Sequence, residues 1–148
     1  MTSVTFLRAA SIFTLLYCAG HTAGMPWTPG QGPAELAVID AMKSAPFDAL
    51  GARRTYWDFY FGFGLVISGY LLVQAVVLWQ LASLAKTIAA RLRPVIVSFL
   101  VAFIFNAIVI WKFFFSVPLA MAIAICVCLV LAFRAAGESA TFRPPTTT

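Results

Sequence analysis

The chain has 148 residues, of which 62% are hydrophobic and 10% are charged, and its formal net charge is +5. Its mean hydropathy is +0.95. Soluble domains carry about 25% charged residues, so the composition excludes an ordinary soluble domain. The cations flank apolar stretches, which argues against nucleic-acid binding and favours contact with a lipid bilayer. The chain is therefore predicted to be an all-α, multi-pass membrane protein with one domain over residues 1–135.

Residues 4–24 form the first apolar segment, and Arg8 near its start can reach the membrane interface. Two interpretations stay open for this segment. It is either a retained helix or a cleaved signal peptide, with an apolar region over 9–20 and a weak cleavage site at 18–20. Retention is preferred because it gives an even number of spans.

Residues 25–55 differ in character and begin with a loop rich in proline and glycine. Leu36, Ile39 and Met42 then recur at every third position with charged residues between them, which predicts a short amphipathic helix. This helix is too short and too charged to cross a bilayer. We expect it to lie at the membrane surface.

Three further apolar stretches, 56–81, 95–115 and 118–134, are predicted to cross the membrane. A basic connection without acids, 82–94, separates the first two of them. The tail over 136–148 is polar, rich in proline and threonine, and expected to be disordered. Short connections make neighbouring helices antiparallel, so the predicted fold is a four-helix antiparallel bundle.

The ten cations divide unevenly between the two ends of this bundle, six against four. The first group is Arg8, Lys86, Arg91, Arg93, Arg134 and Arg143, and the second is Lys43, Arg53, Arg54 and Lys112. Because cytoplasmic loops carry the excess of lysine and arginine, both termini are predicted to be cytoplasmic. The loop over 25–55 is then extracytoplasmic, and the predicted location is a bacterial inner membrane.

Three ionisable residues, His21, Asp58 and Lys112, fall at the outer ends of the first three spans in this topology. Ionisable groups at membrane depth are costly, and they mark functional sites when they face inward. A His21–Asp58 pair would move a proton, and an Asp58–Lys112 pair would hold a polar head group. The alternative is that all three lie in headgroup water, where Asp58 caps the second helix.

Aromatic residues gather at the same boundary, with Trp57 and Tyr60 beside Asp58. They form either an interfacial aromatic belt or a stacking wall for the ring of a bound molecule. The candidate ligand-binding residues are therefore His21, Asp58, Lys112, Trp57 and Tyr60.

Small residues in the outer half of the second span predict the close approach of a neighbouring helix. They are Gly62, Gly64, Ser68 and Gly69. One amide lies near the middle of the second span, Gln74, and one near the middle of the third, Asn106. Because buried amides need partners, these two predict interhelical hydrogen bonds.

No sequence motif indicates a cofactor or a metal. The chain has one histidine, and it lacks both the H-E-x-x-H pattern and a phosphate-binding Gly-Lys loop. Cys18, Cys126 and Cys128 lie inside apolar runs and are expected to be small buried side chains.

Two short patterns resemble a family of small bacterial membrane proteins of unknown function. They are Gly20-His21 in the first span and W-D-F-Y-x-G-F-G over 57–64. The resemblance covers most of the chain through Leu81 and implies four helices and no known activity. The layout is also loosely similar to the DoxX-like and emopamil-binding four-helix families. The latter isomerise sterols with several intramembrane acids, whereas this chain has one acid in its spans.

The sequence therefore predicts a site for an amphipathic or lipid-like ligand at the outer membrane face. One alternative is a non-catalytic subunit that self-associates or joins a membrane complex through the face over 62–69. The other is a membrane enzyme that uses His21 and Asp58, and catalysis is the less favoured of these functions.

Overall fold

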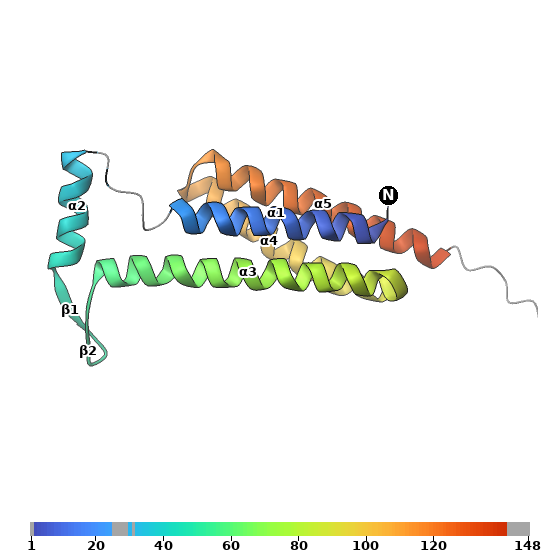
Figure 1. Cartoon of the computed structure of the whole chain (residues 1–148), viewed down its shortest axis with the longest axis horizontal. Coiled ribbons are helices and arrows are strands. Elements are labelled where there is room, and N and C mark those ends of the chain that lie inside the picture. Colours follow the sequence, from blue (N-terminus) through green and yellow to red (C-terminus); the bar gives the residue numbers. More distant parts are fainter. Residues whose placement is uncertain (1, 25–29, 31, 142–148) are drawn as a thin grey trace, which may run out of the picture. The chain divides into compact units, whose positions relative to one another are not determined.

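The computed structural model describes residues 2–24, 30 and 32–141. The elements, in chain order, are α1 (Ser3–Gly24), α2 (Pro33–Ser44), β1 (Pro46–Ala49), β2 (Ala52–Thr55), α3 (Tyr56–Ile88), the 3-10 helix η1 (Ala89–Leu92), α4 (Arg93–Phe113) and α5 (Ser116–Thr141) (Figure 1). They fall into two compact units, one made of the residues up to 17 with those from 71 on, and one made of residues 18–70. The expectation of a single domain stays a prediction.

Three helical stretches are long and apolar enough to cross a membrane: Ser3–Gly24, Tyr56–Phe113 and Ser116–Glu138. They support the expected membrane helices, whereas the number of four spans stays a prediction. The second stretch is 58 residues long, because α3, η1 and α4 follow one another without a gap. Pro94 does not interrupt this stretch, because it lies in the first turn of α4. The N–H groups of a first turn have no acceptor within the helix, so proline costs no hydrogen bond there.

In the first unit, the chain turns back at η1, so that α4 runs opposite to the part of α3 beyond Leu71 (Figure 1). A second turn follows at Phe114, whose backbone is extended and whose N–H donates to the carbonyl oxygen of Ile110. The next helix, α5, continues to Thr141. The tail expected from residue 136 on is thus helical at its start, and residues 142–148 lie outside the described part.

The core of this unit is rich in small side chains, and many large apolar side chains point away from it. Buried alanines include Ala10, Ala75, Ala82, Ala85, Ala122, Ala132 and Ala136. Phe103 fills the core between them, whereas Phe105 is 68% exposed and Trp111 is 76% exposed. Small residues at helix contacts and large apolar residues outside are typical of helices surrounded by lipid, because water would penalise such an apolar surface.

Polar side chains add one specific helix contact to this packing. The hydroxyl of Ser11 in α1 donates to the carbonyl oxygen of Ala75 in α3 at 2.6 Å, and the bond is buried. Gln74 is half-buried. The side-chain oxygen Oδ1 of Asn106 is buried without a hydrogen-bond partner in the described part of the chain, so its interhelical bond stays a prediction.

The second unit contains α2 and a β-hairpin. Helix α2 is the short helix expected within residues 25–55, and none of its residues is buried, as expected of a surface helix. The hairpin pairs Pro46 with Thr55 and Ala49 with Ala52, where no strand was expected. Its two turn residues both have positive φ, 54° at Leu50 and 86° at Gly51, which are the signs that a tight type I′ hairpin turn requires.

Candidate functional site

The hairpin leads directly into α3, and reciprocal hydrogen bonds close the junction. Thr55 is the last residue of β2 and Asp58 lies in the first turn of α3. The Asp58 N–H donates to the Thr55 hydroxyl at 3.2 Å, and the Thr55 N–H donates to Asp58 Oδ2 at 2.7 Å. The Thr55 hydroxyl also donates to Asp58 Oδ2, at 3.0 Å. These bonds form a capping box, so Asp58 caps the helix jointly with Thr55.

Removing the hydroxyl of the capping residue should loosen this junction. Thr55→Ala is expected to lower the free energy of unfolding by about 1 kcal/mol, because the Asp58 N–H loses its acceptor. Denaturant unfolding in mild detergent measures this, and hydrogen exchange of the first α3 amides should accelerate. Thr87→Ala is the matched control, since the exposed Thr87 hydroxyl only donates to the Leu84 carbonyl oxygen in its own helix. Equal losses in both variants would contradict the capping role.

A groove of about 300 Å³ lies beside the capped end of α3. It is lined by Arg54, Asp58, Phe59, Gly62, Phe63 and Val66. The two charged residues come from β2 and the first helical turn, and the apolar residues follow on the next turns of α3. The groove therefore combines a charged end with an apolar wall.

Aromatic contacts hold the hairpin against this wall. The Phe47 ring lies 4.9 Å from Tyr56 and 5.7 Å from Phe59, centroid to centroid, and Phe59 lies 6.2 Å from Phe63. Phe47 is the cross-strand partner of Arg54, and directly paired strand residues share one face of a hairpin. The ring contacts thus fix the strand that carries the guanidinium.

Two predicted ligand residues, Trp57 and Tyr60, do not line the groove. Their rings lie 5.5 Å apart, and the Lys43 ammonium lies 4.6 Å from the Trp57 ring centroid. This cation–π contact ties the end of α2 to the start of α3. Their binding of a ligand stays a prediction.

His21 binds the backbone of α3. Its Nε2 lies 3.1 Å from the carbonyl oxygen of Gly64, and because a carbonyl only accepts, Nε2 carries the hydrogen. Cys18 donates to the carbonyl oxygen of Ser68 at 3.3 Å, and Thr22 donates to the Ser68 hydroxyl at 2.8 Å. These bonds join α1 to α3 at Gly64 and Ser68. The buried Gly64 is six residues, or roughly 9 Å of helix, from Asp58.

The structure therefore brings His21 to Gly64, whereas Asp58 is bonded to Thr55. Gly62 and Gly69 face open space, since a Cβ at either position would meet nothing within 4 Å. Lys112 belongs to the other unit, where its ammonium lies 5.4 Å from the Phe113 ring, so its proximity to Asp58 stays a prediction.

Among the described residues, no three His, Cys, Asp or Glu side chains lie together as a metal site. Comparison with protein-family models, with curated proteins and with solved structures finds no match to this chain.

Proposed function

We propose that this protein holds one amphipathic, lipid-like molecule in the groove beside the hairpin. The observation that carries the proposal is the lining, with Arg54 and Asp58 at one end and Phe59 and Phe63 along the wall. A lipid has the same division into a polar head and an apolar chain. A volume of about 300 Å³ lies at the small end of ligand sites, so the groove would take the headgroup and the first part of a chain.

The proposal places this groove at the outer face of a four-span bundle. A straight helix of 58 residues would extend about 87 Å, whereas the hydrocarbon core is roughly 30 Å thick. The reversal at η1 supports two crossings, one by α3 and one by α4. The basic residues Lys86 and Arg91 flank the turn and favour its placement in the cytoplasm.

Filling the groove tests the binding function. Gly62→Leu should place a side chain in the groove without disturbing the fold, because the Cβ position is open. We expect phospholipid retained through detergent purification, measured by native mass spectrometry, to fall about tenfold, a loss of ~1.4 kcal/mol of binding free energy. Gly69→Leu is the matched control, since Gly69 is equally open but does not line the groove. Unchanged retention in Gly62→Leu would reject the binding function.

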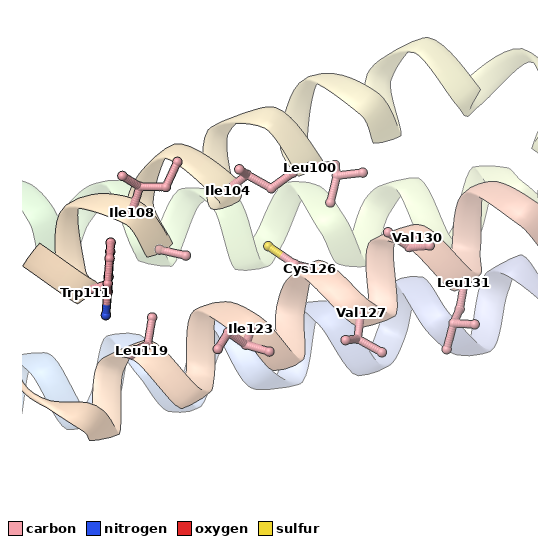
Figure 2. A pocket seen from close by; sticks show the side chains of 11 residues that line it. Leu100, Ile104, Ile108, Trp111, Leu119, Ile123, Cys126, Val127, Val130 and Leu131 are labelled. Carbon is pink, nitrogen blue, oxygen red and sulfur yellow. The ribbon is translucent and has the colours of Figure 1, made fainter.

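A second candidate function is assembly with a transmembrane partner or with another copy of the chain. It is favoured by an apolar groove of about 600 Å³ between α4 and α5. Figure 2 shows Leu100, Ile104 and Ile108 along α4 facing Leu119 and Ile123 along α5. Such a groove suits a neighbouring helix, which packs through van der Waals contact in lipid. Gly62→Leu leaves this groove untouched, so the same variant separates the two functions.

A further inference from the structure

The charged end of the groove beside the hairpin holds two opposite charges, and Arg54 attracts the Asp58 carboxylate without a direct bond to it in the described part of the chain. Arg54 and Asp58 line the same groove. The Arg54 Nη1 donates to the carbonyl oxygen of Arg53 at 2.9 Å, while Asp58 Oδ2 accepts from Thr55. In the described part of the chain, no ion pair joins Arg54 to Asp58, and both side chains are exposed.

Each of the two side chains keeps capacity for a ligand. Arg54 has five N–H donors, and of these the bond to Arg53 uses one. The capping bonds hold Asp58 through Oδ2, so Oδ1 remains to accept. The same bonds keep the carboxylate in place, so that it serves as a fixed negative charge.

We infer that the headgroup bound here is a zwitterion made of a phosphate and a primary ammonium, as in a phosphoethanolamine lipid. This inference rests on the proposed binding function and names the chemical class of its ligand. The phosphate would accept from the Arg54 guanidinium, whose planar donors match phosphate oxygens. The ammonium would donate to Asp58 Oδ1.

Other headgroups fit these two charges less well. A purely anionic headgroup would place its charge beside the Asp58 carboxylate, and this unfavourable pairing provides discrimination. A trimethylammonium headgroup has no N–H to donate to Oδ1. Selectivity should therefore favour phosphatidylethanolamine over both phosphatidylglycerol and phosphatidylcholine.

The test is lipid selectivity in nanodiscs that contain these three lipids in equal parts. We expect the wild-type protein to retain phosphatidylethanolamine about tenfold over phosphatidylglycerol. Asp58→Asn keeps a side-chain oxygen for the Thr55 N–H and removes the charge, so the preference should disappear. Arg54→Gln should weaken retention of all three lipids. Arg53→Gln is the matched control and should change nothing, because neighbouring strand residues point to opposite faces.

Two results would overturn the inference, and they differ from failure of the binding function. If all three lipids are retained equally and Gly62→Leu releases them all, the groove binds lipid without reading the headgroup. If Arg53→Gln weakens retention as much as Arg54→Gln, the attraction is general surface charge. A third result would contradict the lipid ligand itself. If soluble phosphoethanolamine, added at the same concentration as the lipid, displaces the lipid from the groove, the headgroup alone is the ligand.

Discussion

Replacing Gly64 by leucine is expected to separate α1 from α3 within the unit formed by residues 18–70. Gly64 is buried, and its carbonyl oxygen accepts from both His21 Nε2 and the Ser68 hydroxyl. A leucine side chain needs space that a closely packed helix does not leave, and overpacking costs about 1–3 kcal/mol. The free energy of unfolding in mild detergent should fall by that amount.

The control for this prediction is Gly69→Leu, in the same helix and also a change from glycine to leucine. Its Cβ position is open, so that variant should be as stable as the wild type or slightly more stable, because leucine favours a helix more than glycine does. A Gly64→Leu protein as stable as the Gly69→Leu protein would show that α1 does not depend on Gly64.

Cysteine labelling should give opposite results at Thr87, near the end of α3, and at Ser44 and Ser116. If α3 and α4 each cross the membrane, Ser44→Cys and Ser116→Cys react from the outside with an impermeant maleimide, and Thr87→Cys reacts only after the cells are opened. All three positions are exposed. The effect is all-or-none because a polar reagent does not cross the hydrocarbon core.

The wild-type protein serves as the background in this labelling, since Cys18 and Cys128 are buried and Cys126 lines the apolar groove between α4 and α5. Labelling of Thr87→Cys and Ser116→Cys from the same side would mean that the 58-residue stretch does not cross twice, and the proposed four-span topology would be wrong.

Hydrophobic runs made most helices predictable from the sequence. The first helix was expected over 4–24 and spans Ser3–Gly24. The second apolar stretch was expected from residue 56, and α3 begins at Tyr56. The connection over 82–94 was expected to separate two spans, but it is helical. Lysine, arginine and alanine are good helix formers, so basic charge alone does not indicate a loop.

The hairpin was not predictable in the same way. Leu50 adopts a positive φ, which a leucine rarely does, and local sequence gives no sign of it. The Asp48 side chain accepts from the Gly51 N–H at 2.8 Å and supports the turn. Ring contacts of Phe47 with α3 hold the strands, and such contacts between distant residues are invisible to a pattern of polar and apolar positions.

The candidate site was predictable only in part. Asp58 is conspicuous as the one acid in an apolar stretch, and the T-x-x-D pattern from Thr55 is a capping signature that the sequence contains. In the sequence, Arg54 signals only topology. Its part in the groove depends on the register of the hairpin, and the sequence did not reveal that register.

Photocrosslinking tests the central claim, lipid binding in the groove, most directly. A benzophenone side chain in place of Phe63 would lie in the groove, and one in place of Phe105 would lie on α4 outside both grooves; these positions are 63% and 68% exposed. In membranes of mixed phospholipids, the mass of each adduct identifies the attached lipid. We expect one lipid class to dominate at Phe63 and to be lost with Arg54→Gln, while Phe105 reports the bulk composition. The same bulk composition at both positions would contradict a specific lipid site.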